Sequence, residues 1–172
     1  LDPAGCLTLK LAGGERVLEL LDTEPAVADK PDAIEMPEIQ GKVELRDVTF
    51  AYRVDGAVLH NLNLTIEPGQ TVALVGPTGA GKTSISNLIA RFYEISDGAV
   101  LIDGIDVRDV AQRSLRQQMG IVPQDPFLFS GTIADNIRFG KPDAPDVEVV
   151  EAARLANADD FITGAPDGYA TV

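Results

Sequence analysis

The apolar and polar positions around one glycine-rich segment predict a strand, a tight loop and a helix, in that order. Residues 71–75 form a short apolar run with β-branched members, which is typical of a buried parallel strand. After the glycines, apolar residues recur with the i, i+3, i+4, i+7 spacing of one helix face, at Ile85, Leu88, Ile89 and Phe92. We therefore expect the segment to connect a core strand to a helix with one buried face.

Near-alternation of apolar and polar residues predicts another strand over residues 43–52. The alternation slips near Asp47, which indicates a β-bulge. The strand ends at Tyr52, whose aromatic ring is either part of the core or free to stack on a base.

A hairpin is predicted over residues 99–107. Residues 99–102 and 105–107 are two short runs, and the pair Asp103 and Gly104 between them is a strong turn signal. A parallel core strand would need a long crossover on each side. We therefore interpret Asp103 as a turn residue and not as a magnesium ligand.

Two further patterns lie towards the C-terminus. Residues 120–123 read as an apolar strand that leads to Gln124. Residues 147–158 are spaced as a helix along Val147, Val150, Ala153 and Arg154, with an acidic face towards water that includes Glu148 and Glu151.

The N-terminal part predicts a helix followed by an extended segment. Residues 13–22 place Val17, Leu18, Leu20 and Leu21 on one helical stripe. Residues 23–40 carry three prolines and are typical of an extended linker.

The glycine-rich segment itself matches the phosphate-binding pattern G-x-x-x-x-G-K-[ST]. It consists of Gly76, Pro77, Thr78, Gly79, Ala80, Gly81, Lys82 and Thr83. Glycines let the backbone turn tightly so that its N–H groups point at phosphate oxygens, and the following helix adds the positive end of its dipole. Lys82 supplies a charge for the outer phosphates, Thr83 a hydroxyl ligand for Mg²⁺, and Ser84 a hydrogen bond to an inner phosphate. The pattern predicts a nucleoside triphosphate with Mg²⁺ as the ligand.

The composition fits one soluble globular domain of 172 residues, with 45% hydrophobic and 24% charged residues. The net charge of −13 repels phosphate backbones, so nucleic acid is not expected as a partner. No apolar run approaches the roughly 18 residues of a membrane span, and the N-terminus lacks a signal-peptide pattern. The single Cys6 fits a reducing compartment, and the single His60 is expected at the surface.

A complete P-loop enzyme also needs an acidic residue at the end of a hydrophobic strand. The hairpin excludes Asp103, and no other run of four apolar residues after the loop ends in an acid. We therefore expect this chain to bind nucleotide and to hydrolyse it negligibly by itself.

Taken together, these segments resemble the nucleotide-binding domain of ATP-binding cassette (ABC) exporters, over residues 13–172. Residues 41–83 resemble the opening of that domain, residues 98–110 its antiparallel β-subdomain, and residues 115–140 its Q-loop and the start of its helical subdomain. The resemblance implies an α/β fold: a P-loop NTPase (RecA-like) core with an antiparallel β-subdomain and the beginning of an α-helical subdomain.

The resemblance also implies a domain organisation. Residues 1–22 would be the end of the last transmembrane helix with its connecting helix, residues 23–40 a linker, and residues 41–172 the N-terminal portion of the nucleotide-binding domain. Within that portion, residues 41–124 would form the core and β-subdomain, and residues 125–172 the start of the helical subdomain. In the family, the LSGGQ signature, the Walker B strand, the D-loop and the switch histidine follow later.

Several site roles follow from the same resemblance. Tyr52 would stack on adenine, with Val58 lining the pocket. Gln124 would offer its amide oxygen to Mg²⁺ or to the attacking water, and would join Lys82 as a catalytic residue. The next segment would contact the transmembrane domain through Asp125, Pro126, Phe127, Leu128 and Phe129, unless its two phenylalanine rings pack in the core.

The implied function is ATP binding, and ATP hydrolysis in the complete protein, at the cytoplasmic face of the inner membrane. The implied partners are the protein's own or a partner's transmembrane domain and a second nucleotide-binding domain, as a homodimer or heterodimer. A soluble ABC ATPase outside transport is one alternative, but the helix and linker of residues 13–40 favour attachment to a membrane domain. A P-loop GTPase or kinase is another, and the base-reading N-K-x-D motif of GTPases does not occur in the sequence.

Overall fold

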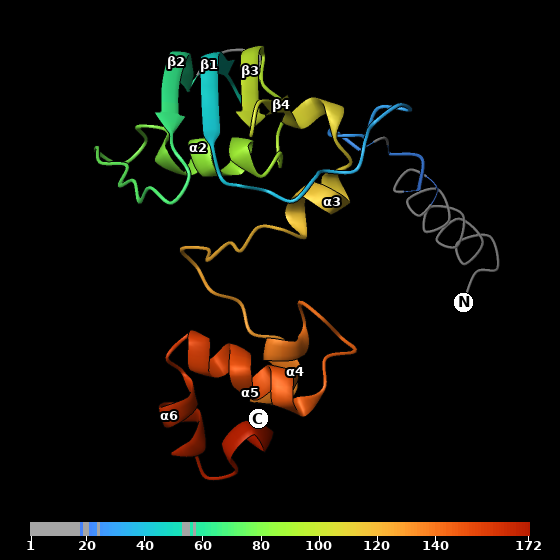
Figure 1. Ribbon diagram of the computed structural model, residues 1–172, viewed down its shortest axis with the longest axis vertical. Coiled ribbons are helices and arrows are strands. Elements are labelled where there is room, and N and C mark those ends of the chain that lie inside the picture. The colour runs from blue at the N-terminus through green and yellow to red at the C-terminus, as the bar shows by residue number, and fades with distance from the viewer. Residues whose placement is uncertain (1–17, 19–20, 24, 53–55, 57) are drawn as a thin grey trace, which may run out of the picture. The chain divides into compact units, whose positions relative to one another are not determined.

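The computed structural model describes residues 18, 21–23, 25–52, 56 and 58–172. The chain divides into two compact units, Leu1–Gly120 and Ile121–Val172 (Figure 1).

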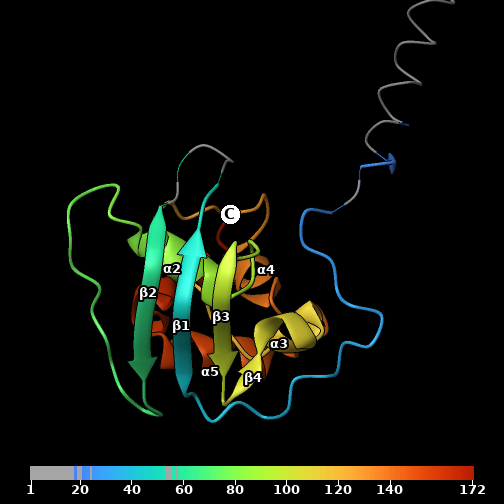
Figure 2. The ribbon, with the colours of Figure 1, turned by 90° about the horizontal axis from the view of Figure 1, so that it is seen from above.

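The first unit is built on a four-stranded antiparallel sheet with the strand order β2-β1-β3-β4 (Figure 2). Its strands are β1 (Val43–Phe50), β2 (Leu59–Ile66), β3 (Asp97–Ile102) and β4 (Ile105–Asp106). His60 lies in β2 and is exposed, as expected.

The predicted bulge in β1 is confirmed. The register of β1 against β2 shifts between Leu45 and Val48, and Asp47 at the shift has a φ of 50°. Opposite this bulge, β3 comes so close that a Cβ atom on Gly98 would lie 2.4 Å from the carbonyl oxygen of Arg46. Only glycine fits at this point of the sheet, because the φ of Gly98 is also positive, at 88°.

The predicted hairpin is confirmed as well. Strands β3 and β4 pair antiparallel, with Ile102 opposite Ile105. Asp103 and Gly104 form the turn between them, both with positive φ. This is the two-residue geometry that Asp-Gly pairs favour.

Helices complete the first unit. They are α2 (Lys82–Ile89), the 3₁₀ turn η1 (Val107–Asp109) and α3 (Gln112–Arg116). Helix α2 buries Ile85 and Leu88 in the same core as Val48 and Phe50 of β1. The predicted face of this helix is therefore confirmed for Ile85 and Leu88.

The prediction for Phe92 is wrong. Helix α2 ends at Ile89, and the Phe92 ring beyond it is 42% exposed. The Arg116 guanidinium lies 4.8 Å from the centre of that ring, as in a cation–π contact. The i+7 position did not extend the buried face because the helix had already ended.

Two apolar runs that were expected to be strands, residues 71–75 as a parallel strand and residues 120–123 as an apolar strand, are not strands. Residues 71–75 have no regular secondary structure, and their side chains are exposed, including 92% of Val75. Residues 120–123 are likewise irregular, and Val122 is 95% exposed. A strand exists only beside a hydrogen-bonding partner, and the described residues supply no strand that pairs with either run.

The predicted linker of residues 23–40 packs against the first unit over much of its length, and we call residues 25–42 the strap. Figures 1 and 2 show it running beside α3. Ile34 forms a parallel bridge with Val110, and Met36 is buried in the core. The backbone N–H of Met36 donates to the Ser114 hydroxyl at 2.8 Å. Turn and helix residues therefore fix the strap to the unit.

Most of the predicted helix over residues 13–22 lies outside the described residues, including Val17 and Leu20. Leu18 and Leu21 are helical and exposed, by 59% and 74%. Among the residues that the structure describes, no helix has the length and apolar character needed to cross a membrane.

The second unit is helical. It contains α4 (Ile133–Arg138), α5 (Asp146–Leu155), α6 (Asp159–Thr163) and the 3₁₀ turn η2 (Gly168–Ala170). A capping box between Thr132 and Asp135 starts α4. The buried residues of the second unit include Val149, Ala153 and Ile162.

Helix α5 confirms the predicted helix but corrects its buried face. Val149 and Ala153 point inward, whereas Val147 is 69% exposed. Glu148 and Glu151 face water, as expected. Val149 and Ala153 lie at i and i+4, one helical turn apart, so they share the face of α5 that is buried.

Candidate functional site

The glycine loop ends where helix α2 begins. Gly81 is the N-cap residue of α2, with the left-handed φ of 84°, and no side chain caps the first turn. Gly79 has a similar φ of 85°. Both values strain any residue but glycine, so the predicted role of these glycines in the turn is confirmed. The uncapped N–H groups of the first turn give the loop a positive end.

The Lys82 ammonium folds back over the loop. Its Nζ donates to the carbonyl oxygens of Gly76 and Pro77, each at 2.8 Å. The charge is therefore held beside the backbone turn that the sequence identified as the phosphate cradle. An anion in the cradle could compete for the same ammonium donors, because charged acceptors bind them more strongly than carbonyls do.

The next two hydroxyls on α2 differ sharply in their surroundings. Thr83 is exposed at the start of the helix. Ser84 is only 4% exposed, and its Oγ lies 2.9 Å from the phenol oxygen of Tyr52. Thr83 can therefore meet a ligand from solvent, while Ser84 is engaged within the protein.

Tyr52 lies in an aromatic cluster next to the start of α2. Its ring meets Phe50 edge-on, with centroids 4.7 Å apart, and meets Tyr93 edge-on at 5.0 Å. The ring is still 47% exposed. Tyr52 is thus neither a core residue nor a freely rotating surface residue.

Val58 lies against the same corner. A Cβ atom on Gly81 would come within 3.4 Å of the Val58 side chain and 2.6 Å of Leu59. The structure therefore brings together Tyr52, Val58 and the first turn of α2, which are separated by up to 32 residues in sequence.

The predicted residues of the second unit follow Ile121 in an irregular, exposed segment. Gln124 is exposed and lies in a bend. Phe127 and Phe129 are 74% and 45% exposed, and their rings meet edge-on at 5.0 Å. Neither ring is buried in a core, which was the alternative interpretation.

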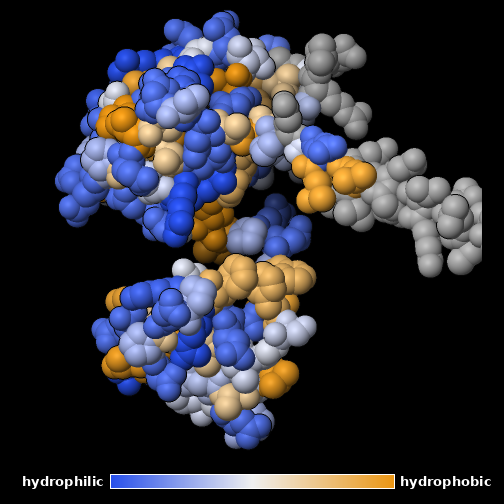
Figure 3. Space-filling view, turned by 90° about the vertical axis from the view of Figure 1, so that its right-hand side faces the viewer, coloured by the Kyte–Doolittle hydropathy of each residue, from blue (hydrophilic) through white to orange (hydrophobic). Residues whose placement is uncertain are grey.

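Phe139 belongs to this apolar surface although the sequence did not single it out. Its ring stacks on Phe129 with centroids 4.1 Å apart, and it is 63% exposed. Figure 3 shows apolar side chains (orange) reaching the surface of the molecule. The signal in the sequence was an aromatic residue just after the end of a short helix, which is too common to identify a surface.

The Asp103 carboxylate is hydrogen-bonded to the backbone of the strap. Its carboxylate accepts the N–H groups of Gln40 at 2.7 Å, Gly41 at 3.1 Å and Lys42 at 2.8 Å. Desolvation alone would raise the pKa of the Asp103 carboxyl, but these backbone hydrogen bonds together lower it below its ordinary value. This is the turn role predicted from the sequence.

The residues present fit a magnesium ion only in combination with a phosphorylated ligand. The described residues contain no group of three or more His, Cys, Asp or Glu side chains that could hold a metal ion. Thr83 and Gln124 each offer one neutral oxygen, and both are exposed. Because Mg²⁺ keeps several waters and binds mainly through substrate phosphates, either oxygen by itself could serve as a protein ligand.

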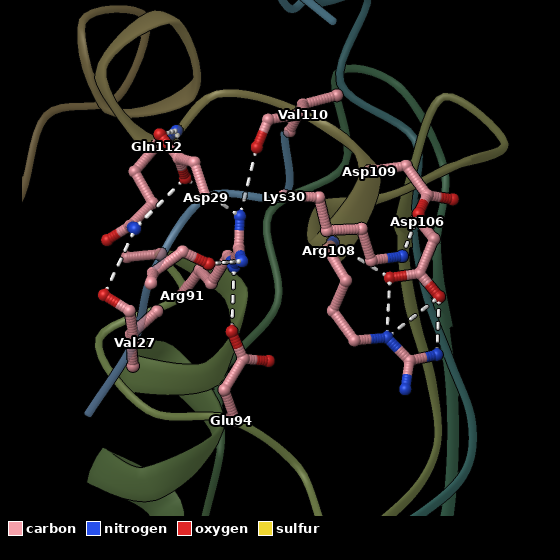
Figure 4. A network of polar contacts seen from close by, with 12 residues as sticks. Val27, Asp29, Lys30, Arg91, Glu94, Asp106, Arg108, Asp109, Val110 and Gln112 are labelled. Atoms are coloured by element: carbon pink, nitrogen blue, oxygen red, sulfur yellow. Dashed lines mark hydrogen bonds and ion pairs between the residues drawn. The ribbon is translucent and has the colours of Figure 1, made fainter. Parts of the chain in front are cut away.

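The far end of α2 is tied to the strap by a buried arginine that the sequence did not reveal (Figure 4). Arg91 is 2% exposed and pairs with Asp29 of the strap at 3.2 Å and with Glu94 at 3.0 Å. It also donates to the carbonyl oxygens of Ala28 and Val110, each at 2.9 Å. Only the i, i+3 pair with Glu94 was visible in the sequence, because the other partners are distant along the chain.

Comparison with known proteins places these features in a family. Residues 59–168 match the family described as ABC transporter. The chain is 49% identical over 162 residues to an ATP-dependent lipid A-core flippase of Syntrophus aciditrophicus. The aligned region covers 94% of this chain and 27% of that protein. It is 50% identical over 161 residues to a fatty acid ABC transporter ATP-binding/permease protein of Mycobacterium bovis. The aligned region covers 94% of this chain and 25% of that protein.

A solved structure shows the same fold. A bacterial Atm1-family ABC exporter with ATP bound matches with a TM-score of 0.87 and 43% identity, over 94% of this chain and 28% of that one. The α/β P-loop NTPase fold predicted from the sequence is thereby confirmed. The chain spans about a quarter of the length of these relatives.

Proposed function

Because the chain belongs to the ABC transporter family, we propose that it binds Mg–ATP as the nucleotide-binding part of an ATP-driven exporter. Nucleotide binding is general in this family of ATPases. The observation that carries the proposal is the loop at the start of α2, where two left-handed glycines and an uncapped first turn lie beside the Lys82 ammonium.

The phosphates would be bound by this loop. The backbone of Gly76, Pro77, Thr78, Gly79, Ala80 and Gly81 would surround them, and Lys82 would exchange its two carbonyl partners for outer phosphate oxygens. Because the net charge is −13, the molecule as a whole repels anions, so a local phosphate-binding site of this kind is needed to hold a nucleotide.

Thr83 and Gln124 would supply the protein's oxygen ligands to Mg²⁺. The exposed Thr83 hydroxyl lies directly after Lys82, and the Gln124 amide oxygen is exposed as well. When bound, Mg²⁺ neutralises charge on the outer phosphates. Gln124 would in addition orient the attacking water.

The base would lie against Tyr52, whose ring is held beside the same helix turn and is 47% exposed. Val58 would border this pocket, because its side chain lies next to Gly81. Stacking on a tyrosine ring favours a flat base without distinguishing adenine from guanine.

Hydrolysis would need groups beyond those that this chain brings to the site. Asp103, the acidic residue that ends an apolar run after the loop, already accepts three backbone N–H groups. We propose that a second nucleotide-binding domain closes over the nucleotide, and that the chain by itself hydrolyses ATP negligibly.

The exposed segment after Gln124 would contact a transmembrane domain at the cytoplasmic face of the membrane. Its members are Asp125, Pro126, Phe127, Leu128 and Phe129, and two of its rings are solvent-exposed although apolar. Exposed apolar clusters of this kind are typical of interaction surfaces. The strap would form the link from the membrane domain. A soluble ABC ATPase is less well supported, because the flippase and the ATP-binding/permease protein above are membrane transporters by name.

Titration calorimetry of the chain with Mg–ATP tests the proposal. We expect saturable binding that is lost in Lys82→Ala and kept in Lys42→Ala, a matched control whose lysine pairs with Glu44 at 3.6 Å. Equal binding by both variants would contradict the proposal. ATP turnover by the chain that disappears in Lys82→Ala would contradict the second part, that hydrolysis needs further groups.

A further inference from the structure

Helix α2 begins at the glycine loop, and the chain just beyond its other end is bound to the strap. We propose that Arg91 is a positioning residue, which couples the docking of the strap to the binding of Mg–ATP through helix α2. The proposal rests on the proposed function and adds a form of regulation to that site. Arg91 acts through the helix and is not one of the residues assigned to the nucleotide.

The first argument is that an arginine occupies a backbone conformation that favours glycine. Arg91 comes two residues after the end of α2 and has a φ of 52°, in the left-handed region. Glycine is the usual residue for this conformation after a helix, because a side chain is disfavoured there. The Arg91 side chain must therefore offset that cost through its own contacts. Strained positions of this kind cluster where the conformation serves a function.

The second argument is the set of partners that the buried Arg91 guanidinium binds (Figure 4). It pairs with Asp29 of the strap at 3.2 Å and donates to the carbonyl oxygen of Ala28 at 2.9 Å. It also pairs with Glu94 at 3.0 Å and donates to the carbonyl oxygen of Val110 at 2.9 Å. A buried charge is tolerated only when it is paired and hydrogen-bonded. Loss of the strap partners would therefore leave Arg91 donors unsatisfied and favour a shift of this residue.

The third argument is that Asp29 is shared by the two helices that meet at this point. Besides pairing with Arg91, its carboxylate accepts the backbone N–H of Gln112, the first residue of α3, at 3.1 Å. At the last residue of α3, the Arg116 guanidinium donates to the carbonyl oxygens of Ala90, at 3.0 Å, and of Arg91. The strap carboxylate therefore contributes to the position of α2 and α3 together.

Helix α2 connects this junction to the phosphate loop. It has only eight residues, and a short hydrogen-bonded helix moves as one piece. A shift at Arg91 would therefore displace the first turn of the helix and Lys82 at its start. The docked strap holds the helix where the loop is already formed, and such preorganisation strengthens binding. By linkage, bound Mg–ATP must favour the docked strap by the same factor.

Calorimetry of Mg–ATP and Mg–tripolyphosphate binding tests the effect of the strap on affinity. Asp29→Ala should weaken both ligands by about three- to tenfold, because the effect reaches the phosphates and not the base. Asp29→Glu keeps the carboxylate and should lose less affinity than Asp29→Ala. Asp103→Asn is the matched control, since it loosens the strap at Lys42, away from α2, and should bind both ligands as the wild type does.

Amide hydrogen exchange tests the reverse direction, with a readout that a purely structural role would not change. Saturating Mg–ATP should slow exchange in the wild type at Ile34 and Met36, whose N–H groups bond the strap to η1 and α3. Lys42, whose N–H is held by Asp103, is the reference and should change less. The slowing should disappear in Asp29→Ala.

Several outcomes would overturn the inference. One is that Asp29→Ala binds as tightly as the wild type, or no more weakly than Asp103→Asn. A loss confined to Mg–ATP also overturns it, because the effect would then not pass through the loop. So does a slowing of exchange that is absent from the wild type or persists in Asp29→Ala. If Asp29→Ala does not fold, Asp29→Glu and the exchange of the wild type still decide.

Failure of the proposed function itself would look different. The wild type would then not bind Mg–ATP, or Lys82→Ala would bind it equally well. A wild type whose binding depends on Lys82 but not on Asp29 would keep the proposed function and remove only the coupling.

Discussion

At the scale of single residues, Asp103 shows how one carboxylate can organise a junction. It sits in the turn between β3 and β4 and accepts three successive backbone N–H groups of the strap. Backbone N–H groups that would otherwise need water are thereby satisfied by one side chain. The turn and the strap are fixed to each other at this residue.

We expect Asp103→Asn to lower the free energy of unfolding by about 1 kcal/mol at neutral pH, after allowing for solvent screening at this position. The pKa of the carboxyl is below its ordinary value of 3.8 in the folded state. Its stabilisation is therefore complete well above this ordinary value, which applies to the unfolded chain, and is lost as the pH falls through the lower folded pKa. Urea unfolding at about pH 7 and about pH 3 should show the difference between wild type and variant shrinking in acid.

The same substitution separates a turn residue from a metal ligand. Mg–ATP affinity should be unchanged in Asp103→Asn. A loss of Mg-dependent binding would contradict the role assigned to Asp103.

Gly98 offers a second prediction at this scale. Gly98→Ala should cost more than the roughly 1–3 kcal/mol of a strained left-handed residue, because its Cβ would also meet the Arg46 carbonyl oxygen at 2.4 Å. Gly104→Ala is the matched control, since Gly104 has a similar φ of 82° and no atom within 4 Å of its Cβ position. Thermal unfolding of both variants measures the difference. Equal losses would mean that the bulge opens to accept the methyl group.

At the scale of elements, local patterns were sufficient where the structure itself is local. The hairpin turn at Asp103, the bulge at Asp47 and the helix that follows the glycine loop each depend on neighbouring residues, and each was predicted. Residues 71–75 and 120–123 have the composition of strands, but a strand needs a partner that composition does not provide. Tyr52 and Ser84 are 32 residues apart in the sequence, and Arg91 and Asp29 are 62 residues apart. Periodic patterns in the sequence do not predict contacts over such separations.

The strap gives a prediction for a whole element. Asp29→Ala would leave the buried Arg91 without its 3.2 Å partner and remove three hydrogen bonds from Gln112. We expect a loss of about 1–3 kcal/mol in the free energy of unfolding. Asp32→Ala, on the exposed turn of the same strap, is the control and should stay within about 0.5 kcal/mol of wild type.

Amide hydrogen exchange would locate the effect of Asp29→Ala. Faster exchange should be found at Ile34 and Met36, whose N–H groups bond to Asp109 and Ser114. Unchanged exchange there would show that the strap is held without the arginine pair.

At the scale of the whole molecule, the strong acidity opposes the ligand that the local site attracts. The net charge of −13 follows from the composition, whereas the fold class followed from the resemblance to a known family. The site residues were nominated from a motif and a resemblance, whereas their mutual geometry required the folded chain. The electrostatic potential of the whole molecule repels an anion, whereas the local potential at the loop attracts it.

We expect the association rate of Mg–ATP to rise as the salt concentration increases from about 0.01 M to about 0.15 M. The Debye length falls from about 30 Å to about 8 Å over this range, which screens the distant acidic residues more than the adjacent Lys82. Stopped-flow measurement with a fluorescent ATP analogue gives the rate, and the matching analogue of uncharged adenosine, which should show no salt effect, is the control. A rate that falls with salt would mean that the loop dominates the approach of the ligand.

Helix α2 has a mechanical consequence for the protein. It contains eight residues and is about 12 Å long, with the glycine loop at one end and Arg91 just beyond the other. Tension applied to the strap would reach this short rod through a buried ion pair, at the end away from the bound phosphates. Helix α2 would then transmit force along its length, with the strap attached at one end and the bound phosphates at the other.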